Sequence, residues 1–574
     1  MVYTTAAGVE QEQRLTAQVR ELAADKSQAL TPDRIDRAAE RFLVANPHVN
    51  RDGAQWVAQR KMAQEIGQGG RLTLSIGVHG AGKTKAVIGV LADAWHEQGR
   101  QVIGVTSPWK ASGELKSAKV DQTMALAALI HRYYEGKVKI DRNTVIVADE
   151  VSLIGIKDQA RLMDIVKETG ARLVEIGDTR QIAAVETPAL DLVARAIGDD
   201  RISKIMTTVR QADDRDKKVA LMWRDGRADE AIEALRQDGR FHLVAGGADA
   251  TVRQTVKVWR DLVDAGSETP LVVAPANRAA RQIGMAIRAE RQAAGEIEPD
   301  ITTVAAIDKN SGERYDLPLA VGDKLRMFTR AWDADAPPKT KLLSSNGDVV
   351  EIRAVLSDGL RVRNEDGIEG RVTWSQMRPW RAPATDPIMA TVGYALTAHT
   401  AQSLTRSDTI FAAPDGTAGI DGKKTYVAMS RHEGAAHMVV SESAERKAIV
   451  RKQMIGAGQV PTRPDVMQHI ADNLSRFAEP ERATDMLRRA SKIERGSVSA
   501  QHQQPSLSLY QRMTLSPLVS RTMEMAKEAH QHLRDFWRET MEAGRRAMER
   551  DPHYQENLRQ RQSERQYRGP SLGR

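Results

Sequence analysis

The sequence feature that most constrains the fold is a glycine-rich segment at residues 77–84, Gly-Val-His-Gly-Ala-Gly-Lys-Thr. It matches the pattern G-x-x-x-x-G-K-[ST] at every fixed position. Alternating apolar and polar residues over 72–76 predict a strand before it, and an apolar run at 86–91 predicts a helix after it. A strand, a glycine turn and a helix start form the setting in which backbone N–H groups converge on a phosphate.

This segment therefore predicts a nucleotide site with ATP and Mg²⁺ as cofactors. Lys83 would reach the β- and γ-phosphates, and the Thr84 hydroxyl would ligate Mg²⁺. The alternative is an ordinary glycine turn before a helix, against which the Lys-Thr pair and the preceding strand both argue. The predicted cofactor-binding residues of the loop are Gly77, Gly80, Ala81, Gly82, Lys83, Thr84 and Lys85.

The composition is that of a basic globular chain without cysteine. The 574 residues carry a formal charge of +8, and this length suggests about four domains. The charge is consistent with a polyanionic partner such as nucleic acid. The absence of Cys excludes disulfides, cysteine-ligated zinc and a thiol nucleophile. We see no signal peptide and no membrane segment in the sequence, so we expect a cytoplasmic protein.

Apolar runs alternate with helical segments along the first half of the chain. Residues 102–105, 145–148 and 173–176 are predicted strands, and 123–134 is a predicted helix. Strands that alternate with helices imply a parallel sheet covered on both faces. A second pattern of this kind starts near residue 205.

The second pattern is interrupted. Between about residues 303 and 385 the sequence turns to short β-like runs with Gly and Asp turns, which we interpret as a small inserted β-barrel. Asn346-Gly347 is a strong hairpin signal within it. The α/β pattern resumes at 388–390, and from about residue 447 the chain is helical and highly charged. The apolar stripe of the last helix predicts packing against the body or another chain.

Polar side chains follow two predicted strands, at the edge where ligands bind in parallel sheets. Asp149 and Glu150 follow the strand at 145–148. An Asp in this position can hold Mg²⁺ through water, and the adjacent Glu can accept a proton from the attacking water. Gln181 follows the strand at 173–176, where either a γ-phosphate sensor or a plain hydrophilic turn explains it.

The ordered motifs resemble the superfamily 1 helicases of the 5′→3′ branch. Within this branch the closest resemblance is to the helicase part of conjugative relaxases of the TraA, TraI and TrwC types. It covers about residues 50–445. The matching positions are Gln59 and residues 77–84, 106–110, 149–152, 177–181, 210–211, 394–405 and 426–431. Thr400 and Ser403 depart from the Lys and Gly that the family commonly carries in the motif at 394–405.

This resemblance implies an α/β fold with two RecA-like P-loop domains, an SH3-like β-barrel inserted in the second, and helical N- and C-terminal extensions. The implied segments are an N-terminal helical segment at 1–48, a first RecA-like domain at 49–204, a second at 205–302 and 386–446, the barrel at 303–385, and a charged helical tail at 447–574.

The resemblance also assigns roles to single residues. Gln59 matches the glutamine that reads adenine, and Thr84 and Asp149 would hold the metal. The implied catalytic residues are Glu150, Gln181, Arg210 and Arg431. The expected nucleic-acid contacts are Thr106, Trp109, Lys110, Thr397, His399 and Gln402, of which Trp109 rests on its position alone.

The implied function is ATP-driven movement on single-stranded DNA, 5′→3′, in conjugative plasmid transfer. A relaxase or other transfer proteins would bind the C-terminal helices. We find no histidine triad and no tyrosine pair of a relaxase site, so DNA nicking is not expected. Three alternatives stay open at this point: a DNA-stimulated ATPase that remodels protein–DNA complexes, a RecD-like repair helicase, and a non-catalytic DNA-binding subunit.

Overall fold

The structure is a computed structural model. It describes residues 5–78, 80–106, 112–184, 187–309, 311–379, 381–402, 404–453, 460–477 and 482–487. All of these lie within the compact part of the chain, Met1–Leu487. The predicted apolar stripe of the last helix lies outside the described residues.

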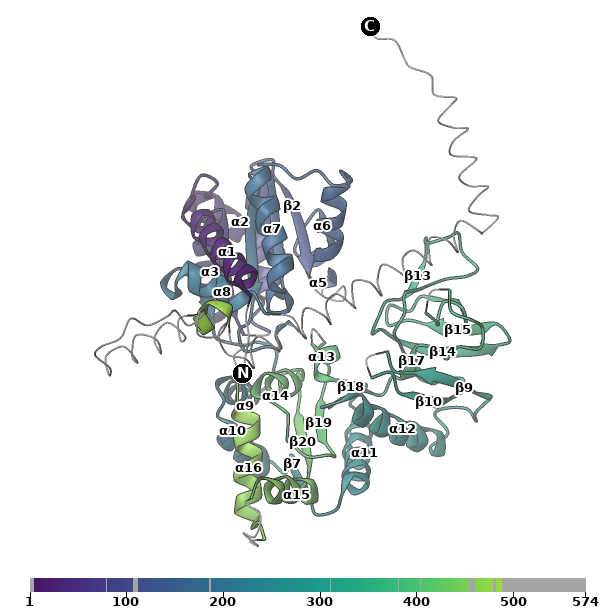
Figure 1. The fold of residues 1–574 in the computed structure, drawn as a ribbon. Helices are drawn as coiled ribbons and strands as arrows, with labels where there is room; N and C mark the ends of the chain where they lie inside the picture. The colour runs from purple at the N-terminus through teal and green to yellow at the C-terminus, as the bar shows by residue number, and fades with distance from the viewer. Residues whose placement is uncertain are drawn as a thin grey trace, which may run out of the picture. The chain divides into compact units, whose positions relative to one another are not determined.

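The first half of the chain builds a six-stranded parallel sheet (Figure 1). In spatial order its strands are β3 (Gln122–Ala125), β2 (Gln101–Thr106), β4 (Thr144–Asp149), β5 (Arg172–Gly177), β1 (Leu72–Gly77) and β6 (Ser203–Ile205). Strands β4 and β5 are buried along their whole length. This is why they appear in the sequence as continuous apolar runs and not as alternating ones.

Successive side chains of this sheet enter different cores, as the period of two requires. Ile146 and Ala148 pack with one cluster, whereas Val145 and Val147 pack with the other. The first face is covered by α1 (Ala6–Ala24), α6 (Leu126–Tyr134), α7 (Ile156–Thr169) and α8 (Leu190–Ile197). The second is covered by α2 (Pro32–Ala45), α3 (Ala54–Gly67), α4 (Gly89–His96) and α5 (Ser112–Ser117).

A second parallel sheet has five strands. In spatial order they are β18 (Ala395–Thr397), β8 (Leu271–Ala274), β19 (Thr409–Ala413), β20 (Ala436–Ser441) and β7 (Phe241–Val244). One face is covered by α11 (Ala248–Asp264) and α12 (Asn277–Ala293). The other is covered by α9 (Asp214–Asp225), α10 (Ala228–Gln237), α13 (Ala398–Ala401), α14 (Gly422–Met429) and α16 (Arg463–Ser475), while α15 (Glu442–Lys452) follows β20. The two parallel sheets confirm the predicted α/β fold class.

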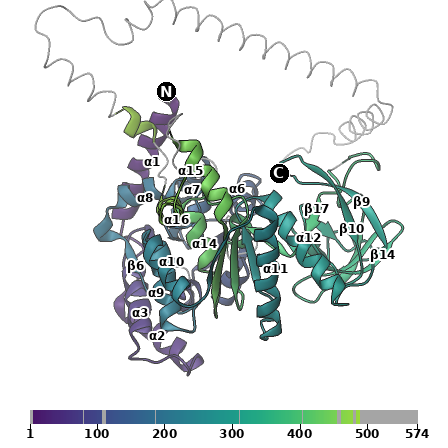
Figure 2. The ribbon, with the colours of Figure 1, turned by 90° about the horizontal axis from the view of Figure 1, so that it is seen from below.

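An antiparallel β-region interrupts the second parallel sheet between β8 and β18. Its five-stranded sheet runs in the order β16 (Glu369–Thr373), β15 (Gly359–Arg363), β14 (Val349–Leu356), β11 (Lys324–Met327) and β17 (Ala390–Val392). Two further strand pairs accompany it, β9 (Thr302–Ile307) with β10 (Arg314–Leu319) and β12 (Ala331–Trp332) with β13 (Leu342–Ser344). Figures 1 and 2 both show α12 beside these strands, and α12 contacts β17 and β18 alike. The SH3-like class of this region stays a prediction.

Three local sequence predictions differ from the structure. Residues 123–125 form part of strand β3, because they pair with the end of β2, and only the rest of the predicted helix is helical. Asn346-Gly347 forms a turn but joins no hairpin, since β13 pairs with β12 whereas β14 pairs with β11 and β15. Strand β17 pairs with β11, so the parallel sheet resumes only at β18.

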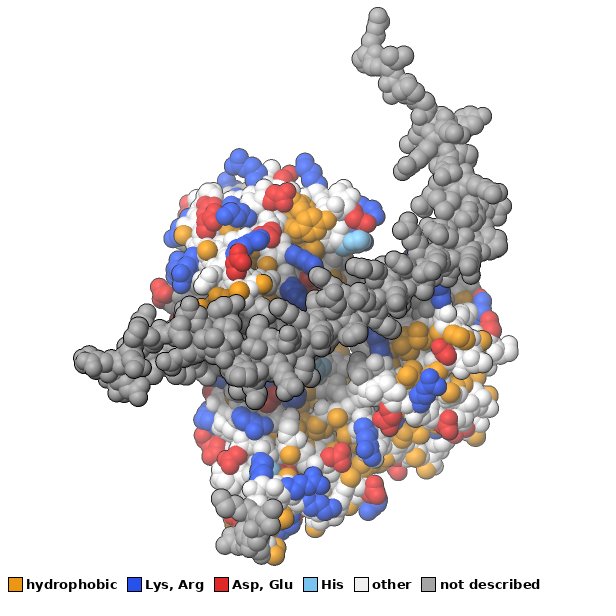
Figure 3. Space-filling model, viewed as in Figure 1, with side chains coloured by type: hydrophobic (Ala, Val, Ile, Leu, Met, Phe, Trp, Pro, Cys, Tyr) orange, Lys and Arg blue, Asp and Glu red, His pale blue; other side chains and the backbone are white. Residues whose placement is uncertain are grey.

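The described surface is mixed in charge. Figure 3 shows Lys and Arg side chains interspersed with Asp and Glu side chains over the visible face. Among the described residues, no helix is both long enough and apolar enough to cross a membrane.

Candidate nucleotide site

The phosphate loop follows β1 and needs glycine at two positions. Gly80 and Gly82 have φ angles of +77° and +69°, which side chains rarely tolerate. Space is also lacking: a Cβ on Gly80 would lie 2.6 Å from Cβ of Arg210, and one on Gly82 would lie 2.5 Å from Nε2 of Gln59. The chain then enters a helical turn, Lys83–Ile88, that leads into α4.

Lys83 lies against its own loop. Its Nζ donates hydrogen bonds to the carbonyl oxygens of Gly77 (2.6 Å) and Val78 (2.9 Å). Burial lowers the pKa of Lys83, and the Arg210 guanidinium lowers it further, while the carboxylates at the strand ends act in the opposite direction. Lys83 and Arg210 are both half-buried and line one cleft, and two cations so close together indicate a place for an anion between them.

Thr84 and Asp149 form the candidate metal site. The Thr84 hydroxyl donates to Oδ2 of Asp149 at 2.8 Å, and the Glu150 N–H donates to Oδ1 at 2.9 Å. A hydroxyl and a carboxylate are the oxygen donors that Mg²⁺ prefers, and it commonly takes only one or two carboxylates together with the substrate phosphates. The donor set therefore fits Mg²⁺.

Glu150 has a strained backbone conformation and a side chain whose pKa is raised. It is a non-glycine residue with φ +54°, a conformation that often marks functional sites. Burial and the adjacent Asp149 raise the pKa of Glu150 to about 7, against the lowering influence of Arg431 and Lys83. A buried carboxylate with a pKa near neutrality is suited to accept a proton from water.

A pair of glutamines connects Glu150 to both sheets. Gln402 donates a hydrogen bond to the Glu150 carboxylate, and its Nε2 also lies 3.1 Å from Oε1 of Gln181. Both glutamines are buried. Gln402, predicted as a DNA contact, thus lies beside the candidate catalytic base, and its role in DNA binding stays a prediction.

The two candidate arginines occupy different positions. Arg210 lies in the connection between β6 and α9, with its Nη1 donating to the carbonyl oxygen of Ser430 at 3.0 Å. Val209, the residue before Arg210, donates its backbone N–H to the carbonyl oxygen of Gly80 at 3.1 Å. Arg431 is fully buried, donates to the Val427 carbonyl oxygen at 2.8 Å, and acts electrostatically on Glu150.

A cleft of about 310 Å³ brings these residues together. It is lined by Gly80, Ala81, Gly82, Lys83, Thr84, Lys85, Ser117, Asp149, Glu150, Arg210, Thr405 and Glu433. Sequence reasoning missed Ser117, Thr405 and Glu433. Thr405 falls at the end of a predicted motif, but nothing in the local sequence singles out the other two. Arg431 and Gln181 do not line the cleft, although both connect to Glu150.

The predicted adenine-reading glutamine also contacts the loop. Gln59 is buried, and its Nε2 donates to the Ala81 carbonyl oxygen at 2.8 Å. Gln55, one helical turn earlier on α3, donates to the same oxygen at 2.7 Å and accepts a hydrogen bond from Thr207. Both side chains hold the phosphate loop against α3.

The predicted DNA contacts are only partly described. Trp109 and Lys110 lie outside the described residues. Thr106 is buried at the end of β2. Thr397 is half-buried and hydrogen-bonds Thr400 at 3.1 Å, while His399 is exposed at the start of α13. Their roles in DNA binding stay predictions.

A buried ion pair lies near the cleft. Asp178 falls in the matched segment 177–181, whereas nothing in the sequence singles out its partner Arg224. Asp178 follows β5 and accepts hydrogen bonds from Nη2 of Arg224 at 3.3 Å and from the hydroxyl of Tyr426 at 3.1 Å. Arg224 belongs to α9 and Tyr426 to α14, and all three side chains are almost completely buried. This cluster joins the end of the first sheet to two helices that cover the second.

Replacing Arg224 by Ala is expected to lower the free energy of unfolding by about 3–5 kcal/mol, because Asp178 would keep a buried charge without its cation. Urea denaturation measures this change. The matched control is Arg227→Ala, which removes an exposed pair with Glu230 and should cost about 1 kcal/mol or less. Equal losses in the free energy of unfolding from both variants would show that the buried pair stabilises the fold no more than the exposed pair does.

The comparisons with known proteins agree with the geometry of this site. Residues 56–246 match the AAA domain family. This match includes the phosphate loop, the metal-site pair and Arg210. The AAA domain match ends just after β7, before the other strands of the second sheet.

Relatives with similar sequences are conjugation proteins. The conjugal transfer protein TraA of Rhizobium radiobacter is 25% identical over 288 residues, covering 50% of this chain and 25% of that protein. The multifunctional conjugation protein TraI of Escherichia coli K12 is 32% identical over 122 residues, covering 20% of this chain and 7% of that protein. The chain thus spans a quarter or less of the length of these two relatives. The matches confirm the resemblance predicted from the motifs.

Similar solved structures include a Bacteroides Pif1 bound to single-stranded DNA. It has a TM-score of 0.43 and 15% sequence identity, and the match covers 77% of this chain and 98% of that chain. A Pif1 helicase from Candida albicans has a TM-score of 0.41 and 15% identity, with 68% of this chain and 95% of that chain covered.

Proposed function

We propose that this chain is an ATP-dependent DNA helicase that moves along single-stranded DNA. The observation that carries the proposal is the composition of the nucleotide cleft. Lys83 and Glu150 come from the first parallel sheet, whereas Thr405 and Glu433 come from the segments around the second. We call the segments that carry the first and the second parallel sheet the first and the second unit. A nucleotide held between these two units can convert its hydrolysis into their relative movement.

In this proposal each polar group of the cleft has one task. Lys83 and Arg210 bind the phosphates, and Thr84 with Asp149 would hold Mg²⁺, which neutralises charge on the β- and γ-phosphates when bound. Glu150 accepts the proton of the attacking water. Gln402, hydrogen-bonded to Glu150 and to Gln181, keeps that carboxylate oriented and links it to the second unit.

Movement along DNA follows from the same contacts. The connection that carries Arg210 touches the phosphate loop at Gly80 and the second unit at Ser430. Ser430 ends α14, and α14 packs against α13, which carries His399 and begins after Thr397. In our proposal a change at the γ-phosphate reaches these two proposed DNA contacts along this route. Similarity to TraA and TraI supports a role in conjugative DNA transfer in the cytoplasm, with a relaxase or other transfer proteins as partners.

A strand-displacement assay with 5′-tailed and 3′-tailed duplexes tests the proposal. We expect ATP-dependent displacement of the strand on 5′-tailed substrates and little on 3′-tailed ones, as measured by release of a labelled strand. Both duplexes carry the same paired region, so each is the control for the other. ATP hydrolysis stimulated by single strands without displacement on either substrate would instead identify an ATPase that remodels protein–DNA complexes.

A further inference from the structure

Arg326 connects the inserted β-region to the segment that carries the proposed DNA contacts. Its neighbours on β11, Leu325 and Met327, point into the hydrophobic core, so the alternation along the strand points Arg326 to the opposite face. On that face its Nη2 donates a hydrogen bond to the hydroxyl of Thr400 on α13 at 2.6 Å. A side chain of the insertion thus reaches directly into the matched motif at 394–405.

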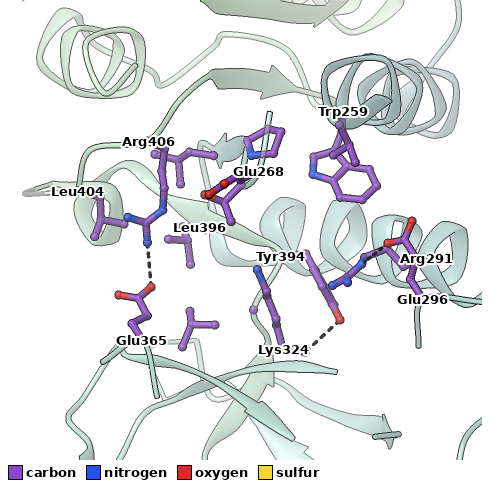
Figure 4. A pocket seen from close by; sticks show the side chains of 16 residues that line it. Trp259, Glu268, Arg291, Glu296, Lys324, Glu365, Tyr394, Leu396, Leu404 and Arg406 are labelled. Carbon is purple, nitrogen blue, oxygen red and sulfur yellow. Dashed lines mark hydrogen bonds and ion pairs between the residues drawn. The ribbon is translucent and has the colours of Figure 1, made fainter. Parts of the chain in front are cut away.

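Lys324, two residues earlier on the same face of β11, has different surroundings. Figure 4 shows its half-buried side chain in a cavity of about 430 Å³, where acidic and basic side chains pair with each other. Arg406 donates to Glu365 at 2.8 Å, and Arg291 donates to Glu296 at 2.8 Å. The charges of this cavity therefore balance each other.

Arg326, by contrast, is a buried cation without an ion pair. It is only 7% exposed, its Nε has no hydrogen-bond partner, and no carboxylate among the described residues forms an ion pair with it. Burial lowers the pKa of Arg326, while Asp308 acts in the opposite direction. Asp308 itself already accepts hydrogen bonds from the Ser311 N–H at 3.1 Å and the Asn277 amide at 3.4 Å. A buried charge without an ion pair is costly, so the surroundings of Arg326 favour an anion close by.

The hydroxyl groups next to Arg326 form a short hydrogen-bonded chain. Oγ1 of Thr400 lies 3.1 Å from Oγ1 of Thr397, which is half-buried and precedes the exposed His399. A guanidinium can only donate, so Thr400 accepts from Arg326 and turns its own hydrogen away from the cation, toward Thr397. The Thr397 hydroxyl then accepts from Thr400 and keeps its hydrogen for a further acceptor. Within the described ranges, the Thr397 hydroxyl makes no other hydrogen bond.

We propose that Arg326 is a positioning residue for DNA binding, which acts through Thr400 to direct the Thr397 hydroxyl toward a phosphate oxygen of single-stranded DNA. A phosphate fits because its oxygens accept hydrogen bonds and its negative charge offsets the buried cation. Position 400 is also where the helicases that this chain resembles commonly carry Lys, so here the cation comes from the insertion instead. The inference rests on the proposed function, because it takes Thr397 as a DNA contact.

A double-mutant cycle tests this chain of hydrogen bonds, with the affinity for a labelled oligo(dT) measured by fluorescence anisotropy in the absence of ATP. Arg326→Met and Thr397→Val are each expected to weaken binding about tenfold, since each removes a charge-assisted contact. The double variant should bind within about twofold of Thr397→Val alone, because both changes break the same chain. Independent roles would multiply to a loss of about a hundredfold, and that result would overturn the proposal.

Variants of Thr400 separate the hydroxyl chain from packing. Thr400→Ser keeps the hydroxyl and should bind within about twofold of the parent protein, whereas Thr400→Val keeps the shape without the hydroxyl and should lose about tenfold. Equal affinities of these two variants would reject the chain, also where Arg326→Met lowers the melting temperature. Arg353→Met removes an exposed arginine of β14 that pairs with Glu351 at 2.7 Å, and as the control for lost charge it should leave the affinity unchanged.

A second oligonucleotide identifies the acceptor. The loss in Thr400→Val should be the same for oligo(dT) and oligo(dA), because a phosphate contact carries no sequence information. A loss on only one of them would assign the acceptor to a base and reject the phosphate. A parent protein that binds neither oligonucleotide would reject the proposed function together with this inference, whereas binding by the parent protein without loss in the variants would reject this inference alone.

Discussion

Replacing Glu150 by Gln is expected to lower kcat for ATP hydrolysis by about 10²–10⁴-fold, because an amide cannot accept the proton of the attacking water. The substitution keeps the size of the side chain and its hydrogen bonding to Gln402. ATP binding should therefore change little, since the phosphates are held by Lys83 and Arg210 in our proposal. Steady-state hydrolysis and binding of a fluorescent ATP analogue measure the two quantities separately.

The same residue predicts a pH dependence. Because burial and Asp149 raise the pKa of Glu150 to about 7, a fraction of the protein carries the protonated, inactive form at neutral pH. We expect kcat/KM to rise with pH below about 7 and to level off above it, since kcat/KM reports groups of the free enzyme. In Glu150→Gln the residual activity should lose this rise.

Glu175 offers a matched control. It is buried on β5, and burial also raises the pKa of Glu175 to about 7, but its carboxylate bonds Gln159 and does not line the nucleotide cleft. Glu175→Gln should leave kcat within about twofold and leave the pH profile intact. If Glu150→Gln retained full ATPase activity, or if both variants lost it equally, Glu150 would not be the base.

The parts of the site that the sequence predicts are those held by local structure. The phosphate loop is predicted because strand, glycine turn and helix are consecutive, and the φ angles of Gly80 and Gly82 require the residues that form the motif. Asp149 and Glu150 are predicted because β4 is a buried strand and its apolar run ends where the carboxylates begin. In each case the physical cause lies within a few residues of the feature.

The parts that the sequence does not predict depend on contacts between distant residues. Arg224 resembles any other helix arginine until the fold brings it to Asp178, 46 positions away. Gln402 matches a DNA-contact motif, yet the fold places it beside Glu150 and Gln181. Asn346-Gly347 predicts a hairpin from turn chemistry alone, whereas the pairing of its flanking strands is decided by other strands of the insertion.

Replacing Arg210 by Ala is expected to give the second large loss, about 10³–10⁵-fold in kcat, which is the range for an arginine that stabilises the charge of a transferring phosphoryl group. The geometry supports such a role. Arg210 lines the cleft with Lys83, its Cβ packs against Gly80, and its Nη1 bonds Ser430 of the second unit. In our proposal Arg210 contacts the γ-phosphate and stabilises it most strongly in the transition state, so the affinity for ADP, which lacks this phosphate, should change little.

Two further variants make this result specific. Arg210→Lys keeps the charge but lacks the planar fork of donors, so we expect it to recover only a small part of the lost rate. Arg215→Ala removes an exposed arginine of the neighbouring helix α9 that pairs with Asp238, and should leave kcat unchanged. Single-turnover hydrolysis in the presence of single-stranded DNA measures all three. If Arg210→Ala weakened ATP and ADP binding equally without lowering kcat, Arg210 would act only in ground-state nucleotide binding. The arginine that acts on the transition state would then have to be sought at Arg431, whose charge already reaches Glu150.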